Sequence, residues 1–311
     1  MFPPVLVLAA IAVGTVPAAA VLASARWPHR SPGAAILLWQ ALGLSWGLAA
    51  IGTLAGLGAI PNQYGVAGGA LDTAIRMLRR ALLGTGIPSS CFARLAFIGA
   101  GVALLALLCW VLVAASAAVF VARHRHRELL SLLAHGDPKV PGALVVDHPS
   151  ATAYCLPGLR STIVISAGTL NLLDQAELAA VLAHERAHLR ARHDLVLLPF
   201  GALVRAFPRA RLVRQAHTTV GLLVEMLADD RALRHRSARE LATALLRVGV
   251  AGTGQAPSGA LAAAANEGEV AARVARLLTP PPRLPAPAQA LICSVAALLV
   301  AVPVAVLLVT F

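Results

Sequence analysis

The residues best suited to carry chemistry are His184, Glu185 and His188, in the pentapeptide HERAH. An α-helix completes a turn every 3.6 residues, so histidines four positions apart project from one helix face. Two such imidazoles can hold one metal ion, and a glutamate beside the first can act as general base on water. The pattern therefore indicates a zinc-dependent hydrolytic site, provided that the segment is helical.

The sequence around this pentapeptide predicts a helix on separate grounds. Asp174 followed three residues later by Glu177 is a capping-box pattern, in which each side chain accepts a hydrogen bond from the other residue's backbone. Strong helix formers, mainly alanine and leucine, follow. We predict a helix from about Glu177 to Arg192, which places both histidines on one face.

A catalytic zinc usually has three protein ligands, so the third must come from another segment. Glu225 and Asp229 are four residues apart and would also share a helix face. Glu225 is the candidate ligand, and Asp229 is the candidate acceptor for the second N–H of a zinc-bound histidine, whose tautomer it would fix. The alternative is that both pentapeptides are ordinary helix surface, with Arg186 and Arg190 as ion partners for the acids.

These motifs, HERAH followed by Glu225-x-x-Ala228-Asp229, resemble those of the gluzincin membrane metallopeptidases. The resemblance covers roughly Ala143 to Leu278 and is specifically to the BlaR/MecR-type antirepressor peptidases and the related HtpX and CAAX-protease group. It implies a zincin-like peptidase domain, Zn²⁺ as cofactor and a peptide or protein substrate. The sequence departs from the family pattern just after the first motif, where the family often has basic residues followed by an aspartate. In this chain Asp194 follows Arg190, Arg192 and His193, at a position slightly shifted from that of the family's aspartate.

The composition is too apolar for an ordinary soluble enzyme. Hydrophobic residues make up 58% of the 311 residues, and charged residues only 13%. The formal net charge is +12, but the arginines are scattered without interleaved aromatic residues, so direct nucleic-acid binding is not expected. The four cysteines lack the spacing of a disulfide framework or a structural zinc site, and we interpret them as packing residues. An integral protein of the lipid bilayer accounts for these features.

Four apolar segments are long enough to cross about 30 Å of hydrocarbon as helices. A signal peptide is the alternative for the first, but the basic residues that normally precede its apolar stretch are missing. A fifth apolar segment, Leu195–Phe207, is too short to span, and we expect a core or interfacial helix there. The four predicted spans are Phe2–Ala25, Ala34–Ile60, Leu95–Ala122 and Ala288–Phe311.

Basic residues predict the orientation of these spans. Arg26 and Arg30 follow the first span and the cluster 123–127 follows the third, so the positive-inside rule places both in the cytoplasm. The loop 61–94 contains a basic amphipathic pattern that suits a helix at the membrane interface, and its arginines weigh against this orientation. We expect a multi-pass protein of a bacterial plasma membrane with a cytoplasmic peptidase domain.

Short runs rich in Val, Ile and Tyr predict strands at Ala143–Asp147, Ala153–Leu156 and Thr162–Ile165. We expect a small antiparallel sheet. In peptidases of the resembling type, an edge strand beside the zinc helix pairs with extended substrate, and Ser161–Ser166 is the candidate. The alternative is that this strand is internal and has no role in substrate binding.

The remaining segments predict helices and their ends. The capping box at Ser237 to Glu240 should begin a helix that Gly249 closes. The low-complexity stretch Gly252–Ala265 should be mobile. The other predicted helices are a short one ending near Gly136, one from about Thr219 to Arg234, and one from Asn266 to Pro280.

The segments together predict an α-helical integral membrane protein with four transmembrane helices and an inserted α+β zincin-like metallopeptidase domain. Residues 1–122 would form three transmembrane helices with their loops, residues 123–287 the zinc metallopeptidase domain, and residues 288–311 the last transmembrane helix.

The leading hypothesis is a membrane-bound zinc endopeptidase. His184, His188 and Glu225 would hold Zn²⁺, and Glu185 would be the catalytic base. The oxyanion would need a further donor, and His217, Arg231 and His235 remain open candidates. The resemblance implies cleavage of a cytosolic regulator such as a BlaI-type transcriptional repressor. The alternatives are an HtpX-like quality-control protease of membrane proteins and a non-catalytic membrane signalling scaffold.

Overall fold

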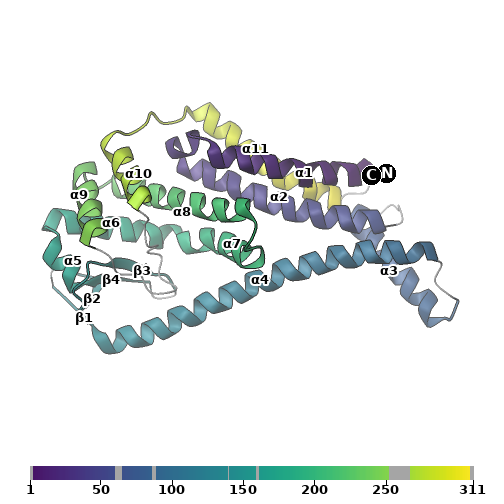
Figure 1. Cartoon of the computed structure of the whole chain (residues 1–311), viewed down its shortest axis with the longest axis horizontal. Coiled ribbons are helices and arrows are strands. Elements are labelled where there is room, and N and C mark those ends of the chain that lie inside the picture. The colour runs from purple at the N-terminus through teal and green to yellow at the C-terminus, as the bar shows by residue number, and fades with distance from the viewer. Residues whose placement is uncertain are drawn as a thin grey trace. The chain divides into compact units, whose positions relative to one another are not determined.

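The computed structural model describes residues 3–59, 65–85, 89–138, 140–158, 161–251 and 267–308. The chain divides into two compact units (Figure 1). The first comprises residues Met1–Val111, Ala210–Ala216 and Leu284–Phe311, and the second comprises Leu112–Arg209 and His217–Arg283.

The first unit is helical in its described part. Helices α1 (Pro3–Ser24), α2 (Pro32–Gly58) and α11 (Ala286–Leu308) pack together, with α3 (Gly65–Leu82) against α2 and α11. Helices α1 and α2 approach each other closely at Gly52 of α2, where an added Cβ would lie 2.8 Å from Leu8 Cδ1 of α1. This unit has its own apolar core, which includes Leu8, Ala49, Val66 and Val306.

Within the described residues, four helices have the length and composition needed to cross a membrane: Pro3–Ser24, Pro32–Gly58, Cys91–Leu133 and Ala286–Leu308. They correspond to the four predicted spans. The third differs from its prediction, because α4 (Ser89–Leu133) continues as one helix for 45 residues. The polar cluster 123–127 therefore lies within α4, and the separate short helix predicted to end near Gly136 is wrong. The physical reason is that residues 123–133 contain no glycine or proline to stop the helix.

The second unit contains a small mixed sheet. Its strands are β1 (Ala134–Gly136), β2 (Ala143–Val146), β3 (Ala153–Leu156) and β4 (Thr162–Ser166), in the order β1-β2-β4-β3. The strand predictions are confirmed, and β1 was not predicted. The purely antiparallel prediction is wrong, because β2 pairs with β4 in parallel, while β1 with β2 and β3 with β4 are antiparallel.

The position of β4 corrects the choice of edge strand. The short connection between β3 and β4 makes them a hairpin, and β4 pairs on its other side with β2. Ser161–Ser166 therefore cannot offer a free edge, and its internal alternative is right. Within the described residues, β3 pairs with one neighbour only, and it contacts the helix that carries the HERAH motif.

The helices of the second unit follow the sheet in sequence. They are α5 (Ala167–Leu172), α6 (Gln175–Ala191), α7 (His193–Ala206), α8 (Arg211–Ala232, whose first residues belong to the other unit), α9 (Ala238–Ala251) and α10 (Glu267–Leu278). Helix α8 begins at Arg211 rather than near Thr219, and α9 continues past Gly249. The predicted capping box at Ser237 is confirmed. The stretch Gly252–Ala265, predicted to be mobile, lies outside the described residues.

Helix α6 is fixed at both ends by its own sequence. Asp174 Oδ1 accepts hydrogen bonds from the N–H groups of Ala176 (2.9 Å) and Glu177 (2.8 Å), and Glu177 Oε2 accepts one from Asp174 N (3.0 Å). The predicted capping box is therefore confirmed. The helix ends at Ala191, because Arg192 adopts the left-handed conformation with φ of 50°. One face of α6 packs on the sheet in a core that includes Leu178, Val181, Leu182, Ile163 and Ile165.

Candidate metal centre and active site

Helix α6 presents His184 and His188 side by side, as the spacing of four predicted. Both are buried. Their Nε2 atoms are 3.0 Å apart, and their rings meet edge to face with centroids 4.7 Å apart. Two ring nitrogens thus point to the same place from one helix.

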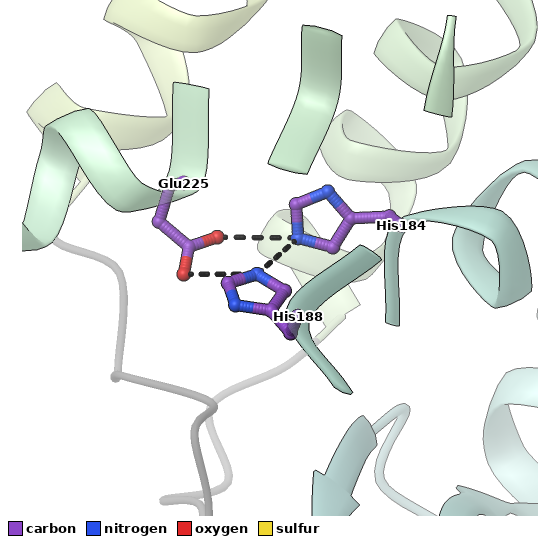
Figure 2. Close-up of side chains that lie close together, drawn as sticks. All are labelled: His184, His188 and Glu225. Carbon is purple, nitrogen blue, oxygen red and sulfur yellow. Dashed lines mark hydrogen bonds and ion pairs between the residues drawn. The ribbon is translucent and has the colours of Figure 1, made fainter. Parts of the chain in front are cut away.

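Helix α8 brings Glu225 to these two nitrogens, although 37 residues separate it from His188 in sequence. Glu225 Oε2 lies 3.3 Å from His184 Nε2, and Oε1 lies 3.4 Å from His188 Nε2. Figure 2 shows the three side chains converging, with the carboxylate facing both rings. Buried residues on either side of Glu225, Val224 and Met226, anchor this part of α8.

The three side chains have the donor atoms and spacing of a zinc site. One ligand atom from each lies within 4.8 Å of the others. Ligands at about 2.0–2.1 Å from a tetrahedral zinc ion are about 3.3 Å apart, close to the 3.0 to 3.4 Å between these donors. The residues therefore fit a zinc ion.

Asp229 lies one helical turn beyond Glu225 and faces the other nitrogen of His184. Its Oδ1 atom is 2.9 Å from His184 Nδ1, and the residue is 1% exposed. Neither Glu225 nor Asp229 pairs with Arg186 or Arg190, their suggested partners on an ordinary helix surface. The structure thus places Asp229 where a carboxylate can orient a histidine ligand.

Arg273, which the sequence reasoning missed, neutralises both carboxylates from α10. Its Nε and Nη2 donate to Asp229 Oδ2 and Oδ1 at 2.9 and 2.7 Å, and its Nη1 lies 2.9 Å from Glu225 Oε2. The side chain is 5% exposed. A usable signal was present, because Arg273 directly precedes the buried Val274 and lies about one helical turn before the buried Leu277 on α10, where an unpaired arginine would be costly.

His193, at the start of α7, is a second residue that the sequence reasoning did not place in the site. Its Nδ1 lies 3.0 Å from Nδ1 of His188, and its Nε2 lies 3.2 Å from Nη1 of Arg231. The ring is 1% exposed. Each histidine of the HERAH motif therefore has a buried partner on the nitrogen that faces away from Glu225.

Burial and charge shift the acid–base behaviour of the ligands. Burial alone would lower the pKa of His184, but the carboxylates of Asp229 and Glu225 outweigh it and raise that pKa to about 9. Burial alone would raise the pKa of Glu225, but His188 and Arg273 hold it well below its ordinary value. Asp229 is likewise kept ionised, because Arg273 and His184 lower its pKa against the effect of burial.

Glu185 has the opposite environment from Glu225. It is buried, and this burial raises the pKa of its carboxyl group against the lowering effect of His184 and His188. The thiol of Cys155 on β3 also lowers the pKa of this carboxyl group, by a smaller amount. A carboxylate with a raised pKa is better suited to accept and return a proton near neutral pH than an exposed one.

Within the described residues, the three candidates for the oxyanion donor form no hydrogen bond or ion pair with His184, His188 or Glu225. Arg231 contacts His193 instead. His217 is partly buried on α8, with a pKa lowered by burial, and His235 is exposed beyond the end of that helix. Asp194, which departs from the family pattern in position, is buried and pairs with Arg123 of α4 at 3.0 Å.

All four cysteines are free thiols. Cys91 and Cys155 are buried, which agrees with a packing role, whereas Cys109 and Cys293 are exposed on apolar helices of the first unit.

Comparison with known families agrees with this chemistry. Residues 121–247 match the model for peptidase family M48, a segment that contains the HERAH motif and Glu225. No curated protein and no solved structure matches the chain. The matched segment covers less than half of the 311 residues, and it supports a zinc metallopeptidase of the group that includes HtpX and the CAAX proteases. Residues 121–247 are thus similar to the peptidase domain of family M48.

Proposed function

We propose that the chain is a zinc endopeptidase embedded in a membrane. The observation that carries this proposal is the convergence of His184, His188 and Glu225 on one point, with Glu185 on the same helix turn. The M48 domain supports a metallopeptidase, and the four long apolar helices support membrane association.

The site residues divide the proposed reaction between them. Zinc held by His184, His188 and Glu225 would supply Lewis-acid activation of water and of the scissile carbonyl. Glu185 would accept a proton from the attacking water and return it to the leaving amine. Asp229 and His193 would hold the two histidines in the orientation that binds the ion.

The sheet provides a place for an extended substrate. Strand β3 has an unpaired edge within the described residues and lies beside α6. A peptide that adds to this edge would satisfy backbone hydrogen bonds and run past the HERAH motif. We therefore propose β3 as the strand that pairs with substrate.

We further propose a multi-pass location in a bacterial plasma membrane, with the peptidase domain in the cytoplasm. The support is the distribution of basic residues, with Arg26 and Arg30 after α1 and the cluster 123–127 after the most apolar part of α4. The Arg76–Arg80 part of α3 argues the other way. Compartment-sensitive reporters after residue 140 and at the chain end measure the orientation, and an external signal after residue 140 would contradict it.

The proposed substrate is a cytosolic regulator such as a BlaI-type transcriptional repressor. The M48 match also favours an HtpX-like role in quality control of membrane proteins as the second candidate. Cells carrying Glu185→Gln, compared with wild type, separate the two by proteomics. Accumulation of one or a few soluble regulators supports the first role, and broad accumulation of damaged membrane proteins supports the second.

A purified preparation tests the enzymatic proposal itself. Wild-type protein in detergent should cleave a panel of fluorogenic peptides, and Glu185→Gln should not. If both proteins fail to cleave every peptide of the panel, the non-catalytic scaffold is favoured; if both cleave equally, Glu185 is not the base.

A further inference from the structure

We propose that the last turns of α4, residues 123–133, are a positioning element that holds β3 and the start of α7 against the metal centre. Arg123, His126 and Arg127 are the positioning residues. The inference rests on the proposed peptidase function and deepens it. It states that α4, one of the four long apolar helices, fixes the geometry of the active site.

Four residues of α4 face the peptidase fold. Arg123, His126, Arg127 and Leu130 follow the i, i+3, i+4, i+7 spacing of one helix face. Leu130 is 6% exposed, whereas Arg125, on the other side of the helix, is exposed. These residues therefore define the side of this part of α4 that packs on the rest of the second unit.

Two of them bind the residues of β3 and its end. His126 Nε2 lies 2.7 Å from the Tyr154 hydroxyl, and Arg127 Nη2 donates to the Pro157 carbonyl at 2.9 Å. The guanidinium of Arg127 also lies directly over Gly158, where a side chain would collide with it. Strand β3 is therefore attached to α4 in its middle and at its end.

Apolar packing continues this attachment. Leu130 forms a buried cluster with Tyr154, Leu156 and Val164 on one face of the sheet. Because side chains alternate along a strand, Cys155 points to the opposite face, where it joins the core beneath α6. Strand β3 is held between α4 and the helix that carries the catalytic base.

Arg123 makes a second attachment, at the junction of α6 and α7. Its Nη1 lies 3.0 Å from Asp194 Oδ2, and the Asp194 side chain is 4% exposed. Asp194 directly follows His193, whose ring contacts His188. A displacement of α4 would therefore be felt both at the proposed substrate strand and next to a metal ligand.

The test compares three arginines of one helix. Arg123→Ala and Arg127→Ala remove contacts, and Arg125→Ala is the control because it removes the same charge from an exposed position. For cleavage by purified full-length protein, we expect Arg127→Ala mainly to raise KM and Arg123→Ala mainly to lower kcat. Each change should be about 10-fold or more, since small misplacements of reacting groups have large effects on rate.

Two further measurements separate positioning from loss of folding. Arg123→Lys should recover most of the lost kcat, because it restores a cation opposite Asp194. Amide hydrogen exchange across residues 153–156 should quicken in Arg127→Ala and stay unchanged in Arg125→Ala, and this readout requires no activity.

The outcomes distinguish the two proposals. If wild-type protein cleaves and Arg123→Ala and Arg127→Ala match Arg125→Ala in KM, kcat and exchange, the positioning role of α4 is wrong. If wild-type protein and Glu185→Gln are equally inactive, the peptidase proposal fails, while faster exchange of β3 in Arg127→Ala alone would still support the attachment.

Discussion

Nδ1 of His184 lies 2.9 Å from Oδ1 of Asp229, so the first histidine of the HERAH motif faces a buried carboxylate on another helix. The same carboxylate accepts two hydrogen bonds from Arg273. The histidine, the acid that faces it and the cation that balances the charge thus come from three helices, α6, α8 and α10.

The role of Asp229 can be tested against its neighbour in sequence. Asp229→Asn should weaken zinc binding by about 10 to 100-fold, because the amide is a poorer acceptor for the His184 N–H. Competition with a chelator measures this affinity. Asp230→Asn is the control, since Asp230 pairs with Arg276 and not with a ligand. Equal affinities of the two variants would remove Asp229 from the site.

Arg273 should be important for stability. Arg273→Met would leave Glu225 and Asp229 as buried carboxylates without their cation, and we expect the free energy of unfolding of the metal-free protein to fall by about 3–5 kcal/mol. Arg276→Met, which breaks a more exposed pair with Asp230, should cost no more than about 1 kcal/mol. Denaturant unfolding in detergent compares them, and equal losses would contradict the account.

His193 should affect zinc binding through His188. His193→Leu removes the contact between their Nδ1 atoms and should weaken zinc binding by about 10 to 100-fold. His217→Leu, on α8, is the matched control. The same chelator competition applies, and a His193→Leu protein that binds zinc as wild type does would show that the contact is only packing.

Zinc uptake should depend on pH in a defined direction. The pKa of His184 is raised to about 9 in the metal-free protein, so at lower pH a proton must leave before zinc binds. The deprotonation of His184 alone should raise the affinity for zinc about tenfold per pH unit, up to about pH 9. Titration from pH 6.5 to 8.5 checks this. Asp229→Asn, which lowers that pKa, should flatten the slope, and an unchanged slope would assign the proton to another group.

The sequence was sufficient to predict those features of the fold and of the site that depend on local interactions. The capping box of Asp174 and Glu177 and the four-residue spacing of His184 and His188 depend on one helix, so both were predictable. Pairing Glu225 with them needed only a known three-ligand rule. Arg273 was missed because its partners lie 44 residues or more away, and no local pattern reports which charge a buried arginine will meet.

The sheet and α4 show a different limit. Strand positions follow from composition, but the order β1-β2-β4-β3 depends on pairing between distant strands, so β4 was wrongly taken as the edge. The third span was predicted to end at Ala122, because the sequence changes from apolar to polar residues there. A helix needs no break where its residues change from apolar to polar, and α4 continues to Leu133.

The central claim is that His184, His188 and Glu225 hold a zinc ion that Glu185 uses for peptide cleavage. Metal analysis of purified wild type, Glu185→Gln and Glu225→Ala, with peptide cleavage measured on the same preparations, tests it most directly. The account predicts one zinc per chain in wild type and in Glu185→Gln, strongly reduced zinc in Glu225→Ala, and cleavage only by wild type. Full zinc and full activity in Glu225→Ala would contradict it.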